Sequence, residues 1–547
     1  MPVLLAALVL SLLSGQEPST VVLRIEVALT DAEGLRTPVP RHALLISNDP
    51  VTSAPRRITT DLEGLATARL RPGRYIVESE RATAFHGKAY EWIQSITVAA
   101  SGETVLQLTG QNAEVTDAPG SGGFAAPDGS EPGADPSLAL GKWRDSVVAL
   151  WTPTTLASGS LVDASGLLLT NARVVGAATS VEVQLTPKTK VAGSVLTADH
   201  ERNVAVIWID PRGVDGIKPL PLTCDQPPPS LTREQEIFII SVPMHRPKQL
   251  TSGEVSRVDP VTVDVDLARR SAGGPAFSES GDLIGITWVS EEDDTIGSGE
   301  TRVIRRDRVC EVVAAARKKM VGATAPSGAQ LPLEPERPFP VDALKQAAER
   351  RAGSLNPYQT TTDGFDVAFI TPVLTYGAQY HADRMRRRTT SADTRTADPS
   401  PMQLRPIMDF ANWSEYVWEF PPVLLIRATP KLAEGFWTKV GRAAAQTQGV
   451  ALPPMKRYKS GFVRMNVFCG DKEVTPIHPF RIERRVTEKD SIFEGLYVVD
   501  PGALGPHCGS VKLVLYAEKE PTRADTRVVD PKILQQIWDD FAPYRDH

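Results

Sequence analysis

The stretch of sequence that decides the fold is Asp266-Leu-Ala-Arg-Arg-Ser-Ala-Gly-Gly-Pro-Ala-Phe277. At its centre stands Gly273-Gly274-Pro275, and the residue immediately before that centre is Ala272. A methyl group has no lone pair, so Ala272 cannot attack a carbonyl carbon. Two residues before Ala272 stands Arg270. The meaning of these two positions comes from the segments that precede and follow the stretch.

Five further segments accompany this stretch in order along the chain. The first of them reads as an apolar run, an Asp-x-x-Gly turn, a second apolar run and Thr-Asn-Ala-Arg-Val-Val. Taken together, the segments resemble the catalytic domain of HtrA-type (Deg) trypsin-like serine proteases, in family order and at family spacing. The resemblance covers roughly residues 141–320 and rests on Ala157–Val175, Asp199–Asp210, Leu250–Ser256, Asp266–Phe277, Gly281–Ile286 and Arg306–Val313.

This resemblance implies a double β-barrel and indicates where a catalytic triad would lie. The family has its reactive Ser where this chain has Ala272, its base His where the chain has Arg173, and its orienting Asp where the chain has Asn203. A family Gly that lets the backbone turn N–H groups toward the oxyanion is replaced by Arg270. All the positions that would carry catalysis are therefore replaced together.

The replacing side chains cannot perform the chemistry of the family. Arg173 is protonated at any relevant pH and has no acceptor, so it cannot act as a general base. Asn203 carries no charge to stabilise an imidazolium, and Ala272 cannot form an acyl-enzyme. Losing the triad costs a factor of about 10⁶ in turnover for a protease of this mechanism. Neighbouring substitutes are poor, because Ser271 is one residue out of register and His200 is expected in a solvated loop.

We therefore predict a pseudoprotease: a serine protease homologue of the peptidase S1 type that is catalytically inactive and acts as a binding or scaffold protein. Its expected partner is a protein or a peptide. The alternative is an active trypsin-like serine endopeptidase that uses non-standard residues or an unrecognised centre in the C-terminal unit. No cofactor or metal is expected in either case.

Length and charge bound the remaining possibilities. A chain of 547 residues is long enough for about three domains. Its net charge of -6 argues against a nucleic-acid partner, which would require a basic face. Residues 1–17 are interpreted as a signal peptide, because Val3–Leu13 is apolar yet too short to span a bilayer. A buried N-terminal strand or helix is the alternative. The predicted location is secreted or periplasmic, with no membrane span in the mature chain.

Residues 20–112 are predicted to form a small β-sandwich. Val21–Val27 alternates like a strand, and Thr60–Val77 reads as a hairpin with Asp/Gly and Pro-Gly turns. The hairpin resembles that of carboxypeptidase-regulatory-like domains, and the resemblance implies a spacer or adhesion module without chemistry of its own. Residues 113–140 are rich in Gly, Pro and acidic residues and are expected to be a linker.

A second Pro-rich linker is expected at 321–340, followed by an α+β domain of unknown type at 341–547. No carboxylate-binding loop of a PDZ domain follows residue 320. The domain is expected to contain an antiparallel sheet. Helices are predicted at 341–353, 432–445 and 531–541, and strands at 365–376, 415–420, 423–427, 462–468, 496–499 and 510–516. The predicted fold class is mainly β: an N-terminal β-sandwich, a trypsin-like double β-barrel and this α+β domain.

The four cysteines suit an oxidising compartment. Cys469 and Cys508 flank strand-like segments of the last domain and are a possible disulfide. Cys224 and Cys310 lie in the protease-like domain, where the resemblance does not require them. A zinc site made of Cys469, His478, His507 and Cys508 is a weaker alternative, because an adjacent His-Cys pair is an awkward ligand spacing.

Overall fold

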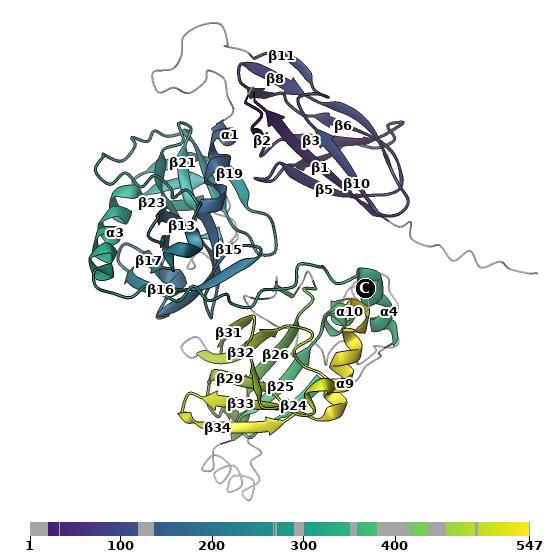
Figure 1. Ribbon diagram of the computed structural model, residues 1–547, viewed down its shortest axis with the longest axis vertical. Coiled ribbons are helices and arrows are strands. Elements are labelled where there is room, and N and C mark those ends of the chain that lie inside the picture. The colour runs from purple at the N-terminus through teal and green to yellow at the C-terminus, as the bar shows by residue number, and fades with distance from the viewer. Residues whose placement is uncertain are drawn as a thin grey trace, which may run out of the picture.

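The computed structural model describes residues 20–31, 33–118, 136–265, 267, 271–288, 300–350, 358–379, 413, 416–417, 420–434, 456–486 and 491–545. The predicted signal peptide at 1–17 and Arg270 lie outside these residues, as does most of the linker expected at 113–140. Figure 1 shows three bodies in chain order: an N-terminal β module, a double barrel and a C-terminal α+β domain. The prediction of a mainly β chain with a trypsin-like double barrel is confirmed.

The N-terminal module consists of sheets that share one core. In one sheet, β1 (Val21–Thr30) pairs with β10 (Glu103–Leu108) and β5 (Leu65–Leu70), and also with β2 (Arg36–Pro38). A second sheet has the order β4 (Arg56–Thr59), β3 (Ala43–Asn48), β6 (Gly73–Ser79) and β9 (Ile93–Val98). Alternate residues of both sheets, including Ile25, Ile46 and Val77, are buried in the shared core.

This module extends beyond the boundary expected at residue 112. Strand β11 (Glu114–Asp117) pairs antiparallel with β8 (Lys88–Glu91), which in turn pairs with β7 (Thr83–Phe85). The segment was expected to be linker because its neighbours are rich in Gly and Pro. Its backbone groups are instead used in a sheet ladder, so the expected start of the linker at 113 is a few residues too early.

Two closed barrels of six strands each follow. The short helix α1 (Pro136–Leu140) and the 3-10 helix Gly141–Ser146 lead into the first barrel, and α3 (Arg306–Met320) packs against both barrels. The first barrel contains β12 (Val147–Trp151), β13 (Leu156–Asp163), β14 (Leu167–Thr170), β15 (Ser180–Thr186), β16 (Thr189–Asp199) and β17 (Val204–Trp208). The second contains β18 (Glu236–Ser241), β19 (Gln249–Val258), β20 (Val261–Asp264), β21 (Pro275–Ser278), β22 (Leu283–Trp288) and β23 (Glu300–Arg305).

Residues 321–340 have no helix or strand, yet they are not a free spacer. This strap follows α3 and runs along the first barrel toward the C-terminal domain (Figure 1). The N–H of Leu331 donates to the carbonyl of Lys190 at 2.7 Å, and Phe339 is buried in the C-terminal core. The strap therefore joins the two domains physically.

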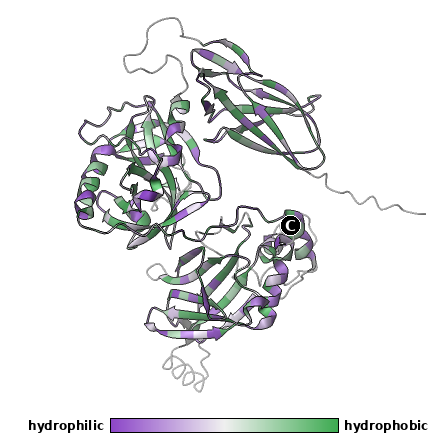
Figure 2. Cartoon of the chain, in the orientation of Figure 1, coloured by the Kyte–Doolittle hydropathy of each residue, from purple (hydrophilic) through white to green (hydrophobic). Residues whose placement is uncertain are grey.

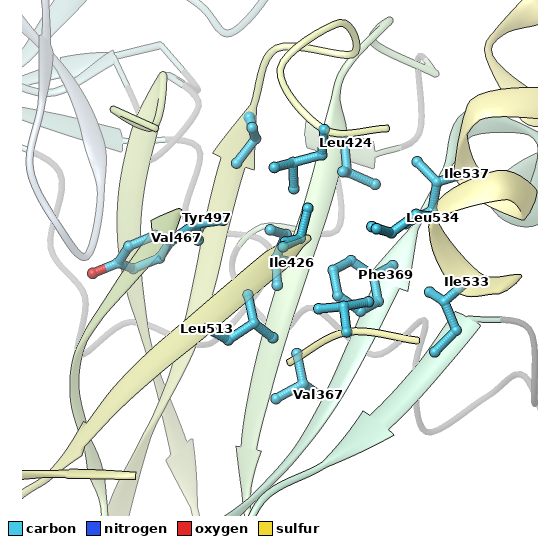
Figure 3. Close-up of a cluster of buried hydrophobic side chains, with 14 of the residues drawn as sticks. Val367, Phe369, Leu424, Ile426, Val467, Tyr497, Leu513, Ile533, Leu534 and Ile537 are labelled. Atoms are coloured by element: carbon cyan, nitrogen blue, oxygen red, sulfur yellow. The ribbon is translucent and has the colours of Figure 1, made fainter. Parts of the chain in front are cut away.

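The C-terminal domain packs two sheets and a helix around one core. One sheet has the order β24 (Gln359–Thr361), β25 (Phe365–Ile370), β26 (Leu424–Pro430), β32 (Ser491–Val499) and β31 (His478–Arg485). The other has the order β30 (Lys472–Val474), β29 (Phe462–Cys469), β33 (Val511–Ala517) and β34 (Glu520–Val528). In Figure 3, Ile533, Leu534 and Ile537 of α9 (Pro531–Asp540) point toward the side chains of these strands. The short helices α4 (Val341–Arg350) and α10 (Ala542–Arg545) lie beside α9 in Figure 1.

Three local predictions for this domain differ from the structure. The strand expected at 365–376 ends at Ile370, because Thr371 accepts a hydrogen bond from the N–H of Leu374 and residues 372–379 are helical. The helix expected at 432–445 begins instead as strand β27 (Leu432–Glu434), which pairs with β28 (Lys456–Tyr458). Its remainder lies outside the described residues. Tyr416 and Val417, expected in a strand, are helical.

The pattern of hydropathy explains why these strands form where they do. Figure 2 shows hydrophobic stretches along the strands of all three bodies and a mixture of hydrophobic and hydrophilic residues on α3. Within the described ranges, no helix is both long and apolar enough to cross a membrane.

Candidate functional site: the seam between the two barrels

The loop before β21 is packed tightly against strands of both barrels. Gly273 has φ +87°, and a Cβ added there would lie 2.3 Å from the carbonyl oxygen of Ser158. A Cβ at Gly274 would lie 2.2 Å from the carbonyl oxygen of Ile240. Both positions therefore require glycine. The N–H of Gly273 donates to the carbonyl of Thr287, and the N–H of Thr287 donates to the carbonyl of Gly274.

Ala272 lies at the contact between the barrels. Its carbonyl accepts a hydrogen bond of 2.8 Å from the N–H of Ser158 on β13, and the residue is 5% exposed. The hydroxyl of Thr170, at the end of β14, donates to the carbonyl of the same Ser158 at 2.9 Å. The position of the expected nucleophile in the second barrel is thus tied to the end of the strand that leads to Arg173.

Arg173 and Asn203 are in direct contact. The side-chain Oδ1 of Asn203 accepts a hydrogen bond of 3.0 Å from the backbone N–H of Arg173 in α2 (Ala172–Val175). Asn203 has φ +54°, a conformation that asparagine tolerates better than most residues. Its Nδ2 is buried without a partner among the described residues. The amide therefore positions the backbone at 173 but has no charge to offer to a base.

The side chain of Arg173 crosses the seam toward the second barrel. Its guanidinium carbon lies 5.2 Å from the centre of the Trp288 ring, at the end of β22. Trp288 is adjacent to Thr287, which holds the loop at 273–274 through hydrogen bonds. The structure thus brings Arg173, Asn203 and Ala272 to one seam, in an arrangement that contains no described nucleophile–base pair.

The neighbours considered as substitutes do not change this chemistry. Ser271 is 3% exposed, and its carbonyl accepts from the hydroxyl of Thr287 at 3.4 Å. His200 is exposed in the turn after β16. Arg270, the expected oxyanion-loop position, lies outside the described residues, so its effect on the loop stays a prediction.

One feature of the seam was not predicted from the sequence. Arg302 of β23 stands directly opposite Trp288 in the strand register, and its guanidinium carbon also lies 5.2 Å from the centre of that ring. Two arginines from different barrels therefore share one indole. The contact between Arg302 and Trp288 depends on the register of β22 against β23, and an alternating sequence pattern alone does not define that register.

A second polar cluster, which we call the clasp, joins the barrels to the C-terminal domain. His478 is 1% exposed; its Nδ1 lies 2.6 Å from Glu182 of β15 and its Nε2 lies 3.1 Å from Glu334 of the strap. Glu334 also accepts from the hydroxyl of Tyr416 at 2.8 Å and contacts His245 at 3.0 Å. A cavity of about 780 Å³ beside the clasp is lined by residues of the barrels, the strap and the C-terminal domain.

The imidazole of His478 bridges two carboxylates, because a carboxylate oxygen of Glu182 faces one ring nitrogen and a carboxylate oxygen of Glu334 faces the other. Burial raises the pKa of Glu334, but hydrogen bonds from His245 and His478 outweigh it and hold that pKa well below its usual value. Burial of Tyr416 and the nearby carboxylate of Glu334 raise the pKa of the phenol well above 10.

The cysteines form two disulfides. Cys469 is joined to Cys508 with 1.99 Å between the sulfurs, and Cys224 is joined to Cys310, a pair that the resemblance did not imply. His507 lies 3.6 Å from the sulfur of Cys508, so it completes a small group of possible ligands. Disulfide sulfurs are not the thiolates that bind zinc. His478, the other residue of the weaker zinc alternative, belongs instead to the clasp.

Comparisons with known proteins match this part of the chain. Residues 157–286 match the family described as trypsin-like peptidase domain. Protease Do-like 1, chloroplastic, from Arabidopsis thaliana is 27% identical over 192 residues, which are 32% of this chain and 43% of that protein. The putative serine protease HhoA of Synechocystis sp. is 28% identical over 152 residues, or 25% of this chain and 38% of that protein. A probable periplasmic serine endoprotease DegP-like of Halomonas elongata is 28% identical over 24% of this chain and 29% of its own length.

The matched part spans less than half the length of each of these relatives. Among solved structures, the serine endoprotease from Yersinia pestis matches with a TM-score of 0.29 and 20% identity over 33% of this chain and 65% of that one. The segments recognised in the sequence, the two closed barrels and the sequence relatives all indicate the same kind of domain. The chain contains a trypsin-like peptidase domain with HtrA-type proteases as its relatives.

Proposed function

We propose that this chain is an exported pseudoprotease whose trypsin-like domain binds a protein or peptide partner without cleaving it. The observation that carries the proposal is the composition of the seam: an alanine, an arginine and an asparagine stand at Ala272, Arg173 and Asn203. Nucleophilic attack, proton abstraction and stabilisation of an imidazolium are thereby lost in a single site. Because triad residues act as a unit, the remaining neighbours cannot recover much of the rate.

Export is supported by the apolar run at Val3–Leu13 and by the compartment named for the DegP-like relatives, which are called periplasmic. Two disulfides agree with an oxidising compartment. The scaffold role is supported by the strap and the clasp, because they hold the C-terminal domain against the barrels. A peptide-binding seam and a docked second domain together suit assembly of a complex.

The direct test is labelling with a fluorophosphonate probe, which reacts with an activated serine. We expect no labelling of the intact chain and no cleavage of unfolded casein. Labelling that is lost when Ser271 or His200 is replaced would refute the proposal and favour an active serine endopeptidase with non-standard residues. Casein cleavage that survives both replacements would reveal an active centre elsewhere in the chain.

Restoring the triad tests the same proposal from the opposite direction. Ala272→Ser alone should not label, because Arg173 cannot accept the proton of the new hydroxyl. The triple variant with Arg173→His and Asn203→Asp should label slowly. Adding Arg270→Gly should accelerate the labelling by about several hundredfold. Removing one oxyanion donor costs about 3–4 kcal/mol in a protease of this mechanism. A single Ser variant that labels as fast as the quadruple variant would contradict the reasoning.

A further inference from the structure

Arg173 and Arg302 form an exposed cationic pair at the seam. Both side chains are exposed, and both guanidinium carbons lie 5.2 Å from the centre of the Trp288 ring. The two charges are therefore at most twice that distance apart. Neither side chain forms an ion pair with a carboxylate among the described residues, whereas Arg305, close by on the same strand, contacts Asp307 at 3.7 Å. Glu300 lies two residues from Arg302 on β23 but outside ion-pair distance.

A cation–π contact with the indole leaves the N–H groups of each guanidinium available for another partner. An arginine over an aromatic ring uses its flat face, while its in-plane N–H groups stay available for a planar carboxylate. The ring also restricts the arginine, so less rotamer freedom is lost when an anion binds. Arg173 and Arg302, from opposite sides of the seam, therefore present two preorganised guanidinium groups to a ligand.

We propose that this pair, with Trp288 between its members, is a binding site for an acidic peptide segment that bears at least two carboxylates. The inference rests on the proposed function, since a seam that does not cleave is free to retain its ligand. The chain as a whole carries -6, yet these two neighbouring cations have no carboxylate partner among the described residues. A peptide with two carboxylates can neutralise both and form charge-assisted bonds with each.

The test is fluorescence anisotropy of a labelled hexaglutamate peptide with blocked termini, titrated with the full chain. A hexaglutamine peptide serves as the neutral probe. We expect binding of hexaglutamate only, weakening as salt is raised from about 0.05 M to about 0.3 M. Arg173→Gln and Arg302→Gln should each weaken binding about tenfold, as expected for loss of a hydrogen bond to a charged group. Arg302→Lys should weaken binding less than Arg302→Gln does, because the charge stays. It should still weaken binding somewhat, because the planar fork of the guanidinium is lost.

Arg257→Gln is the matched control. Arg257 is an exposed arginine of β19 in the same barrel, and no ion pair is recorded for it within the described residues, so the variant removes an equal charge from another surface. Its affinity should stay within about twofold of the parent, and circular dichroism should show that every variant is folded. If all three glutamine variants weaken binding equally, the affinity depends only on net charge, and the proposed site at Arg173 and Arg302 is wrong.

Three further outcomes separate this inference from its competitors. A single-stranded oligonucleotide of equal charge that binds more tightly than hexaglutamate would overturn the choice of a peptide. The sequence Glu291-Glu292-Asp293-Asp294 follows Trp288 and lies outside the described residues. Peptide binding that occurs only when these four acids are changed to amides would make the chain's own segment the occupant. Absence of binding together with absence of probe labelling would refute this site and leave the proposed pseudoprotease intact.

Discussion

Replacing Glu334 by glutamine should open the junction between the barrels and the C-terminal domain. Its carboxylate accepts from Tyr416 at 2.8 Å and contacts His478 at 3.1 Å and His245 at 3.0 Å. Glutamine keeps one acceptor oxygen and presents an NH₂ group where the other oxygen was. One or two bonds of the charge-assisted kind are therefore lost.

The magnitude follows from these contacts. A hydrogen bond to a charged group contributes about 1.5–3 kcal/mol, and removing one partner of a buried ion pair costs more than removing both. The side chain of Glu334 is 20% exposed, so water compensates part of the loss. We expect Glu334→Gln to lower the free energy of opening of the strap by about 2–3 kcal/mol at neutral pH.

The assay is amide hydrogen exchange of Leu331, whose N–H donates to the carbonyl of Lys190 across the junction. Exchange that proceeds through local opening should accelerate about 30- to 150-fold for the expected free-energy change. The amide of Val183 in the first barrel, paired with Leu150, should be unaffected. Fluorescence offers a second readout, since the rings of Trp151 and Trp413 stack across the same junction with centroids 6.1 Å apart.

The matched control is Glu336→Gln, two residues along the same strap. Glu336 is exposed and no ion pair is recorded for it within the described ranges, so its replacement should change the exchange of Leu331 by less than about threefold. If Glu334→Gln leaves that exchange within threefold of the parent, or if both variants accelerate it equally, the clasp does not hold the domains together.

Three further predictions concern stability. Gly273→Ala should destabilise the double barrel by about 2–4 kcal/mol in denaturant unfolding, because φ is +87° and the new Cβ meets the carbonyl of Ser158; a loss below 1 kcal/mol would contradict the geometry. The pKa of Glu334 is depressed, so its contribution is present above the usual value of 4.5 and is lost as pH falls below it; the protection of the Leu331 amide, relative to its intrinsic exchange rate at each pH, should then fall with acid in the parent and fall much less steeply in Glu334→Gln. Cys224 and Cys310 are 86 residues apart, so replacing both by serine should cost about 4.6 kcal/mol, measured by thermal unfolding, and an unchanged midpoint would refute the pairing.

From the sequence alone, the double barrel was predicted through a family resemblance, and the composition of its seam could be read directly. Alternating and apolar runs such as Leu167–Thr170 and Val204–Trp208 are local signals, and the turns between them carry the glycines that their geometry requires. The replacements at Ala272, Arg173 and Asn203 could be recognised because each lies inside a short segment of known order. In the C-terminal domain, β25, β26, β29, β32 and β33 were predicted for the same local reason, whereas the long strands β31 and β34 were not predicted.

Only the tertiary structure decided which distant side chains meet. Trp288 and Arg302 face each other through a strand register, and Arg173 reaches them from the other barrel. The clasp gathers Glu182, Glu334 and His478 from three separate elements, one of which was expected to be a mere linker. Such contacts depend on how rigid bodies dock, and docking is set by the packing of whole surfaces, whereas a strand or a turn is specified by a few neighbouring residues.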